Sequence, residues 1–401
     1  MLYRKPEYFE KFHCIADKCE DTCCAGWQIV VDKEALEKYK KIHTTYLYKI
    51  MGCVDWETKT FRQDNEKRCA FLNKDNLCDM YKNLGEDSLC KTCREYPRHT
   101  EEFEGVRELT LSISCPEVAR ILMEEKNPVT FISYENTEEE TEDYEDFDLF
   151  LYSILENARE EMLKILQNRE LTLQERTMLV LGMAHDMQGR VNRQEMFACE
   201  DVVRKYKKET ALQYVKKHLE QRSEKETTLA FELFEKLYEL ELLHEEWDLL
   251  LHETQTALFY HRKERSVKET QNMEDIFTTQ HLSNAPLIKV KEIFMYHRKE
   301  FEIWKKEHSE TDIHLEQLLV YFLFTYFVGA VYDGEIFAKA QMAVYCTWMI
   351  ELLWMARWLL NGKELTKEEM TELVYRFSRE VEHSDDNLEH IEKIMGKKWL
   401  L

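Results

Sequence analysis

Sulfur chemistry is concentrated at one end of this chain. Ten of its twelve cysteines fall within the first 115 residues, and only Cys199 and Cys346 lie in the remainder of the 401 residues. Two of the ten are adjacent, Cys23 and Cys24, and Cys90-x2-Cys93 is a short chelating loop of the kind found in zinc and iron–sulfur sites. Thiols at this density form disulfides, bind zinc or hold an iron–sulfur cluster.

The cellular compartment that we expect for this protein makes disulfides improbable. Residues 1–12 contain no apolar run and no small-residue cleavage site, so we expect no secretory signal peptide. A protein that stays in the cytoplasm meets a reducing environment in which structural disulfides are rare. The sequence therefore predicts a cytoplasmic protein whose thiolates bind metal.

Spacing limits which thiols can share a site. Cys19 and Cys23 are four residues apart and would lie on one face of a helix, whereas Cys23 and Cys24 would point about 100° apart. Those two can serve one compact centre only if the backbone turns there. The wide, irregular spacings favour an iron–sulfur cluster gathered from several segments, and zinc is the alternative. The cysteines expected to be small buried hydrophobes are Cys53, Cys199 and Cys346.

Four motifs in this part are Cys19-x3-Cys23-Cys24-x2-Trp27, Cys69-x8-Cys78, Thr92-Cys93-Arg94-x2-Pro97-Arg98 and Ser112-x-Ser114-Cys115-Pro116. They resemble the flagellin lysine-N-methylase family, whose members carry a CxxCxxCC-type zinc- or iron-chelating domain. Residues 378–384, Ser-Arg-Glu-Val-Glu-His-Ser, resemble the C-terminal part of that family. The resemblance runs over most of the chain.

The resemblance implies S-adenosylmethionine (SAM)-dependent methyl transfer to lysine side chains of flagellin, with a [4Fe–4S] cluster held by the cysteines. The matching positions are Cys14, Cys19, Cys23, Cys24, Cys69, Cys78, Cys93 and Cys115. One cluster needs at most four thiols, so either two metal sites exist or some of the eight support the ligands. The chain departs from the generic motif in its wider first spacings and in the additional Cys90.

Arg94 and Arg98 are the predicted cofactor-binding residues. They flank Pro97 just after Cys93, where positive charge would favour the reduced state of a cluster and could hold a carboxylate. Surface salt bridges are the alternative explanation.

Methylation requires a neutral lysine amine, although free lysine has a pKa of about 10.4. A base must therefore lie within reach, and the sequence leaves the catalytic residues unknown. Glu382-His383 is a candidate pair, with a helix-end histidine beside a solvated glutamate as the alternative. The chain has no GxGxxG motif and no βαβ rhythm, so SAM must bind by an architecture other than a Rossmann sheet. An open iron of the cluster could chelate it.

The composition of the chain limits the kinds of partner that the protein is expected to bind. The formal net charge of −23 argues against nucleic acid and suits a lysine-bearing partner. The uncharged stretch 317–332 is shorter than the roughly 20 residues of a spanning helix. We expect it to be a buried core helix rather than a transmembrane segment, and it leaves a peripheral membrane contact open.

The expected fold is mostly α. A cysteine-rich α+β metal-binding unit occupies residues 1–130, an acidic linker residues 131–148, and a larger all-α helical domain residues 149–401. The first unit has a helix near 32–42 and a strand over 106–114. A capping box at Thr366-x2-Glu369 follows a helix end at Asn361-Gly362. Helical periodicity covers residues 150–167, 171–188, 228–254, 288–307, 316–332, 336–360 and 367–381.

Two other functions remain compatible with the sequence. The first is a non-catalytic protein in which cysteines hold zinc or iron for stability alone. The second is a related iron–sulfur SAM enzyme that modifies another peptide. The sequence leaves open which four cysteines bind a cluster, whether methyl transfer is polar or radical, how many methyl groups are added, and the oligomeric state.

Overall fold

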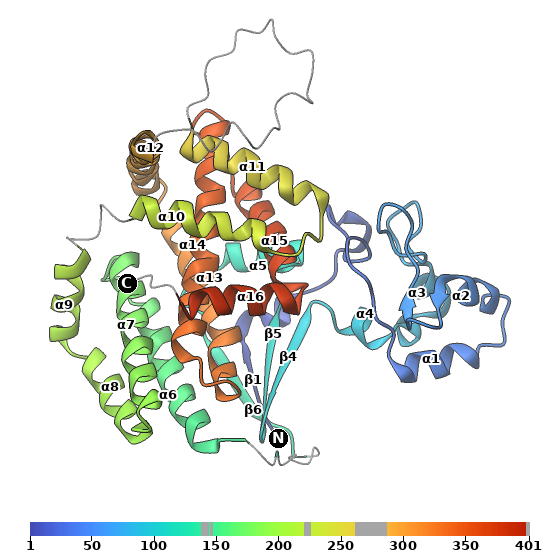
Figure 1. Cartoon of the computed structure of the whole chain (residues 1–401). Helices are drawn as coiled ribbons and strands as arrows, with labels where there is room; N and C mark the ends of the chain where they lie inside the picture. Colours follow the sequence, from blue (N-terminus) through green and yellow to red (C-terminus); the bar gives the residue numbers. More distant parts are fainter. Residues whose placement is uncertain (138–143, 145–146, 220–225, 261–286, 398–401) are drawn as a thin grey trace, which may run out of the picture. The chain divides into compact units, whose positions relative to one another are not determined.

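The computed structural model describes residues 1–137, 144, 147–219, 226–260 and 287–397 (Figure 1). The chain is mostly helical, and its small sheet comes from the N-terminal part, as the composition and periodicity predict. It forms two compact units. Unit 1 contains Met1–Leu149, Glu241–His244 and Val374–Leu388, and unit 2 contains Phe150–Leu240, Glu245–Leu373 and Glu389–Leu401.

A four-stranded sheet supports unit 1. Its strands are β1 (Leu2–Pro6), β4 (Arg98–Phe103), β5 (Val106–Leu111) and β6 (Phe131–Glu135), in the order β4-β5-β1-β6. β1 is parallel to β5 and antiparallel to β6, and β4 and β5 form a hairpin. β5 ends earlier than the predicted strand because Ser112 N donates to Pro97 O (2.8 Å), which turns the chain toward Cys115.

The cysteines of unit 1 lie among short elements. These are α1 (Lys33–Lys40), α2 (Leu47–Cys53), β2 (Val54–Asp55), β3 (Thr60–Phe61), α3 (Asp79–Leu84), α4 (Lys91–Glu95) and α5 (Pro116–Glu124). The helix predicted near 32–42 is confirmed as α1, where the Asp32 carboxylate accepts from Ala35 N at 2.9 Å. Tyr39, Ile50 and Val54 are fully buried and form part of a local apolar core.

Unit 2 is all helical in the part that the structure describes. Its helices are α6 (Leu149–Leu166), α7 (Leu173–Asn192), α8 (Cys199–Tyr206), α9 (Glu209–Leu219), α10 (Glu226–Glu235), α11 (Glu245–Phe259), α12 (Leu287–Glu307), α13 (Glu310–Tyr326), α14 (Ile336–Leu360) and the first part of α15 (Lys367–Glu382). α14 has the predicted bounds and packs against α7, α11 and α13. Gly362 follows it with φ +70°, and the predicted capping box forms, with Glu369 N donating to Thr366 Oγ1 (3.2 Å).

The single helix predicted over residues 228–254 is wrong. The chain leaves the helical path between α10 and α11, and residues 241–244 join unit 1. Their backbone groups are satisfied by side chains rather than by a helix. Glu241 N donates to Asn387 Oδ1 (2.7 Å) and Leu243 N donates to Glu380 Oε2 (2.9 Å). Both acceptors lie far along the chain, so local periodicity carries no sign of them.

Each compact unit is discontinuous in sequence, and two features bear on the expected domain organisation. Residues 131–135 of the predicted acidic linker form β6, and residues 138–143 and 145–146 lie outside the described residues. The C-terminal half of α15 and the start of α16 (Asp385–Met395) belong to unit 1 rather than to the helical unit.

The apolar stretch singled out for a membrane check lies within a helical segment, Glu310–Val331, that is long and apolar enough to cross a membrane by length and composition. However, 83% of its most apolar window is buried inside the protein, as in the core helix of a globular unit. It is the one segment of this kind within the described residues. Length and composition are weak evidence for a membrane span when the helix is covered in this way.

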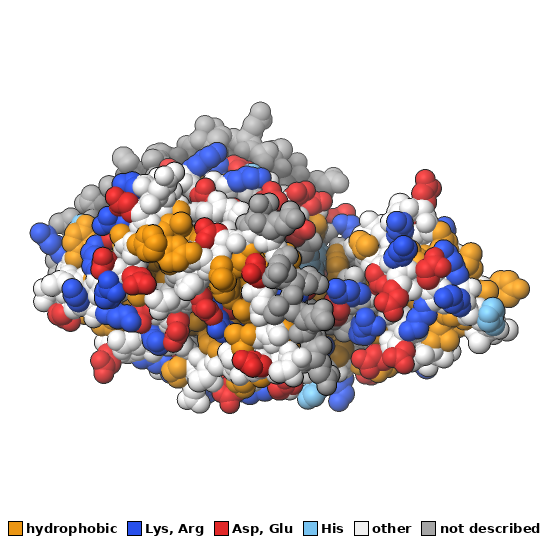
Figure 2. Space-filling view, turned by 90° about the horizontal axis from the view of Figure 1, so that it is seen from below, with side chains coloured by type: hydrophobic (Ala, Val, Ile, Leu, Met, Phe, Trp, Pro, Cys, Tyr) orange, Lys and Arg blue, Asp and Glu red, His pale blue; other side chains and the backbone are white. Residues whose placement is uncertain are grey.

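Charges of both signs are mixed on the protein surface. On the face drawn in Figure 2, acidic and basic side chains alternate with apolar ones, without one extended basic area. Phosphate backbones bind where lysines and arginines gather. This face therefore lacks the pattern of a nucleic-acid interface.

Glu316 on α13 is a fully buried carboxylate of unit 2. It is 0% exposed and accepts a two-pronged contact from Arg169 (Nη2 to Oε1, 2.8 Å; Nε to Oε2, 3.1 Å) together with a bond from Arg176 on α7. Two guanidinium groups therefore offset the cost of burying this carboxylate.

Replacing Glu316 by alanine should lower the free energy of unfolding by about 3–5 kcal/mol, because it leaves the buried guanidinium of Arg176 without its anion. Urea unfolding followed by circular dichroism measures the change. The matched control is Glu160→Ala, which removes an exposed partner of Lys164 and should cost at most about 1 kcal/mol. If the two changes lower the free energy of unfolding equally, the contacts of Glu316 with Arg169 and Arg176 stabilise the protein no more than an exposed ion pair does.

Candidate metal centre

All ten N-terminal cysteines lie in unit 1 as free thiols. Eight of them are the predicted ligands, and their neighbours divide them into two groups of four. Thiol group 1 is Cys14, Cys19, Cys23 and Cys115, and thiol group 2 is Cys24, Cys69, Cys78 and Cys93.

Thiol group 1 joins the loop that follows β1 to the residue that precedes α5. The Cys23 thiol interacts electrostatically with Cys115 and Cys14, and the Cys115 thiol interacts with Cys19 and Cys14. Cys115 immediately precedes Pro116 at the start of α5, and its carbonyl accepts from Ala119 N at 2.9 Å. The fixed φ of proline suits this first helical position, so the helix start holds Cys115 in place.

Arg379 on α15 ties together the two segments of thiol group 1. Its Nε donates to Ser114 O (2.9 Å) and its Nη2 donates to Asp21 O (2.7 Å), while Nη1 pairs with the Asp21 carboxylate. Asp21 O also accepts from Cys19 Sγ (3.2 Å). The arginine is only 3% exposed. A planar guanidinium can satisfy several acceptors at once, whereas a lysine ammonium lacks this fixed fork.

Thiol group 2 is built on an apolar core. Cys24 interacts electrostatically with Cys69, Cys78 and Cys93. All four pack with Tyr39, Phe61 and Phe71 in one hydrophobic cluster that also contains Cys53 and Cys90. In the described part of the chain, thiol group 1 lies outside this cluster.

Backbone pairing fixes the positions of thiol group 2. Cys69 N donates to Cys24 O at 2.8 Å, and Cys78 is bridged to Leu72 just before α3 begins. These bonds bring three cysteines from separate loops together without regular strands. Their sequence spacing is irregular for that reason.

The fourth member, Cys93, lies in α4 together with the additional Cys90. The Asp32 carboxylate accepts from Lys91 N (2.7 Å) and so fixes the start of α4 against the residue that caps α1. A hydrogen bond between the two thiols raises the pKa of Cys93 well above its usual value and lowers the pKa of Cys90. Cys90 therefore supports Cys93 directly.

Cys23 and Cys24 stand where the two groups meet. The chain turns there, with Ala25 N donating to Thr22 O (3.3 Å), and Trp27 Nε1 donates to Cys23 O at 2.8 Å. The two thiols hydrogen-bond to each other, which raises the pKa of Cys23 well above its usual value and lowers the pKa of Cys24 to about 7. The turn that the sequence required for adjacent ligands is present, but each thiol has its own set of neighbours.

Burial keeps most of these thiols protonated without metal. It raises the pKa of Cys69 and of Cys115 to about 12, and it also raises the pKa of Cys19 and Cys78. A thiolate is the form that binds metal, so binding must release these protons.

Zinc and a [4Fe–4S] cluster place different demands on ligand spacing. Zinc, with Zn–S bonds of about 2.3 Å, holds four sulfurs within about 4 Å of one another. A [4Fe–4S] cluster takes one thiolate per iron and spreads its ligands more widely. Among the described residues, no three Cys, His, Asp or Glu side chains lie where one metal ion could bind them all.

A polar network surrounds thiol group 1. His383 Nε2 lies 2.9 Å from Ser114 Oγ, and its ring contacts Trp27 and Tyr96 at centroid distances of 5.1 and 5.8 Å. Burial, together with the charge of Arg379, lowers the pKa of His383 to about 3. Its imidazole is therefore neutral and weakly basic, a poor fit to the role of general base that Glu382-His383 suggested.

A different histidine is paired with a buried carboxylate. His244 Nδ1 bonds to Glu380, which also accepts from Leu243 N at 2.9 Å and is 1% exposed. Gly26 has φ +91°, and a Cβ at this position would collide with the His244 imidazole. The pair therefore lies against the loop that carries Cys23 and Cys24.

The predicted cofactor arginines lie apart from these contacts. Arg94 is exposed on α4, and Arg98 is exposed above the ring of Phe12 at 5.2 Å. Their cofactor role stays a prediction. Among the eight candidate thiols, Cys24 interacts with Arg68, and Cys19 and Cys115 interact with Arg379.

The sequence alone does not lead us to predict that Arg68, Arg379, His244 and Glu380 lie near the candidate thiols. Two signals were present: Arg68 directly precedes Cys69, and Arg379 and Glu380 belong to the family-like segment 378–384. No local signal marks His244, because its partner lies more than a hundred residues away in the sequence.

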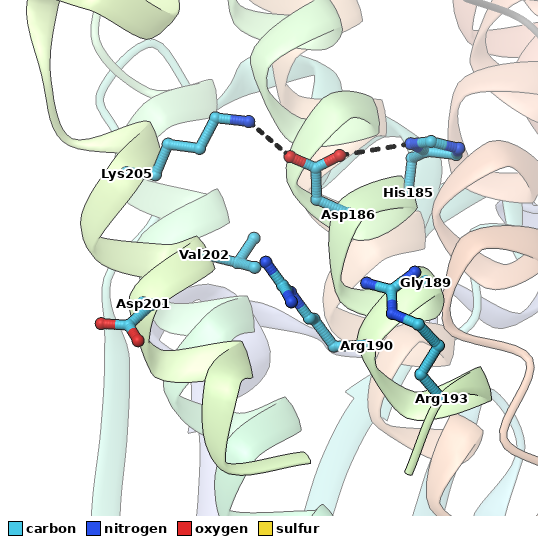
Figure 3. Close-up of a pocket in the computed structure, with 8 residues that line it drawn as sticks. All are labelled: His185, Asp186, Gly189, Arg190, Arg193, Asp201, Val202 and Lys205. Atoms are coloured by element: carbon cyan, nitrogen blue, oxygen red, sulfur yellow. Dashed lines mark hydrogen bonds and ion pairs between the residues drawn. The ribbon is translucent and has the colours of Figure 1, made fainter. Parts of the chain in front are cut away.

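Two hollows of unit 2 have linings rich in polar and charged groups in the part of the chain that the structure describes. The smaller, about 350 Å³, is lined by charged groups that are already paired. Figure 3 shows Lys205 and His185 on either side of Asp186, and Arg190 donates to Glu195 at 2.8 Å. The larger, about 560 Å³, is lined by apolar, polar and charged side chains and includes a buried ion pair at 2.7 Å between Lys305 and Glu351.

Comparison with known proteins gives matches to curated proteins. The flagellar biosynthetic protein FliU of Salmonella muenchen is 30% identical over 138 residues, covering 29% of this chain and 75% of FliU. The lysine-N-methylases of Salmonella typhimurium and Salmonella choleraesuis are also 30% identical over 138 residues, but the match covers 32% of their length. No solved structure matches the chain.

The helical part of the chain matches a family model. Residues 159–400 match the FliB lysine N-methylase C-terminal domain, which is more than half of the chain. This match agrees with the resemblance that the cysteine motifs and residues 378–384 show. The chain belongs to the FliB lysine N-methylase family.

Proposed function

We propose that this protein is a cytoplasmic enzyme that transfers methyl groups from SAM to lysine side chains of flagellin. Membership of the FliB lysine N-methylase family, shown by the match over residues 159–400, is the observation that carries the proposal. Its net charge of −23 suits a substrate that presents lysines. The relatives named lysine-N-methylase are matched over 32% of their length, so the substrate is part of the proposal.

The second part of the proposal is that the N-terminal thiols hold iron–sulfur chemistry. Support comes from the eight free candidate thiols gathered in unit 1, of which Cys69 and Cys115 are buried and all but Cys14 are at least half-buried. When bound, a cluster would supply one-electron redox chemistry or structural cross-linking of the loops. The chain's own part is to bury the thiols and to hold their loops through Arg379 and the apolar core.

Deprotonation of the substrate lysine falls to His244 in this proposal. The buried Glu380 holds Nδ1, so Nε2, which lies against Gly26, is the remaining ring nitrogen that could accept the proton. His383 is unsuited because burial holds its pKa at about 3.

The direct test of the proposed function is methyl transfer by the anaerobically reconstituted protein. Incubation with SAM carrying a deuterated methyl group and purified flagellin should add labelled methyl groups to flagellin lysines, read by peptide mass spectrometry. Labelled lysines on another protein, with none on flagellin, would show that flagellin is not the substrate. If a fully metal-loaded protein transfers no methyl group, the enzymatic role is contradicted.

Arg379→Lys should weaken metal retention. The change keeps the charge but removes the fork that holds Asp21 and Ser114, and losing a group that positions ligands typically costs about 10–100-fold in metal affinity. Iron per chain after anaerobic gel filtration measures the effect. Arg204→Lys, an exposed arginine on α8 that pairs with Glu200 and Asp201, is the matched control. Wild-type iron content in Arg379→Lys would contradict this role.

His244→Gln should lower kcat by about 10²–10⁴-fold while leaving the iron content and KM close to wild type. His390→Gln is the control, because His390 also pairs with a carboxylate, Glu239, but at an exposed position. If His244→Gln retains the wild-type kcat, the His244–Glu380 pair serves only to hold the loop.

A further inference from the structure

We propose that the larger hollow of unit 2 is the binding site for SAM, the methyl donor of the proposed function on which this inference rests. The hollow has a volume of about 560 Å³ and is lined by side chains of α7, α9, α12, α13 and α14. Pockets for small molecules commonly measure about 300–1,000 Å³. The size therefore suits a nucleoside joined to an amino acid.

Buried charges of both signs belong to the lining. Lys305 Nζ donates to Glu351 Oε1 at 2.7 Å, and Arg298 Nη1 lies 3.0 Å from the same oxygen. Lys305 and Glu351 are only 8% and 6% exposed. Lys306, also in the lining, is exposed, so solvent screens its charge. Fixed cations beside fixed anions match the carboxylate and the ammonium of an α-amino acid.

The buried cluster carries an excess of negative charge. Glu302 Oε1 and Asp312 Oδ1 lie 3.4 and 3.3 Å from Lys305 Nζ. Both oxygens are buried, and neither accepts a hydrogen bond within the described residues. With Glu351 they make three carboxylates against the two cations Lys305 and Arg298. A buried acceptor without a hydrogen bond is costly, and a positively charged ligand group would relieve that cost.

Other parts of the lining are apolar. Leu181 on α7 and Leu319 on α13 are buried, and the half-buried Trp348 on α14 supplies an aromatic ring. Nucleic-acid bases stack on aromatic side chains, and indole rings also attract cations. SAM combines an adenine base with an amino acid and a positively charged sulfonium, so the lining offers a partner for each of its parts.

The smaller hollow of unit 2, shown in Figure 3, lacks this combination. Its volume is about 350 Å³, and Val202 is the one large apolar side chain of its lining. Asp201 lines this hollow and pairs with Arg204 at an exposed position. Asp201 therefore offers a matched control, an acidic residue in a different hollow of the same unit.

The test measures the affinity of the full-length, anaerobically reconstituted protein for radiolabelled SAM by equilibrium dialysis. Glu302→Gln and Trp348→Ala should each raise Kd by at least about tenfold, because one removes a charge and the other a stacking surface. Asp201→Asn should keep the wild-type Kd. A wild-type Kd in both Glu302→Gln and Trp348→Ala would overturn the proposal.

A measurement without variants covers the case in which a substitution impairs folding. The wild-type protein is irradiated with ultraviolet light in the presence of SAM that carries a labelled methyl group, and labelled peptides are identified by mass spectrometry. We expect the label in peptides covering residues 298–319 or 344–351, with excess unlabelled SAM suppressing it. Label confined to other parts of the chain, such as the cysteine loops of unit 1, would overturn the proposal.

These binding readouts are independent of catalysis. Methyl transfer to flagellin by a protein whose donor label lies outside the hollow would refute the proposed site and leave the proposed function standing. SAM bound in the hollow of a protein that transfers no methyl group would do the reverse.

Discussion

A buried guanidinium holds the cysteine loops of unit 1 to the C-terminal segment. Arg379 is 3% exposed and binds Asp21, which follows Cys19, and Ser114, which precedes Cys115. Without the hydrogen bonds of this guanidinium, the loop of Cys19 and the loop of Cys115 would lose the residue that joins them. The dependence explains why residues 374–388 fold with unit 1 although they belong to the long helical part of the sequence.

Ligand count constrains the chemistry of the proposed cluster. An open iron that chelates SAM requires a cluster held by fewer thiolates than it has irons. The eight candidate thiols are twice the number that one [4Fe–4S] cluster takes, so most of them would have to support the ligands or serve elsewhere.

Local patterns predicted much of the fold. The bounds of α14, the helix end at Gly362 and the capping box of Thr366 and Glu369 follow from neighbouring residues, and the structure has them as expected. The break between α10 and α11 could not be predicted, because Asn387 and Glu380 satisfy its backbone from far along the chain.

The same distinction applies to the site. The family resemblance identified the eight candidate thiols, and the adjacent Cys23 and Cys24 indicated a turn, but the neighbours of each thiol depend on contacts across loops. Nearness in sequence to Cys93 made Arg94 and Arg98 candidates, whereas Arg68 interacts with Cys24 and Arg379 interacts with Cys19. The His244–Glu380 pair depends entirely on tertiary contact. Residues that act through long-range contacts therefore leave little trace in one sequence.

Anomalous diffraction at the iron absorption edge from anaerobically grown crystals would test most directly the proposal that the N-terminal thiols hold iron. The proposal predicts an iron peak ligated by cysteines from among Cys14, Cys19, Cys23, Cys24, Cys69, Cys78, Cys93 and Cys115. Crystals of the reconstituted protein without iron at these thiols would contradict it.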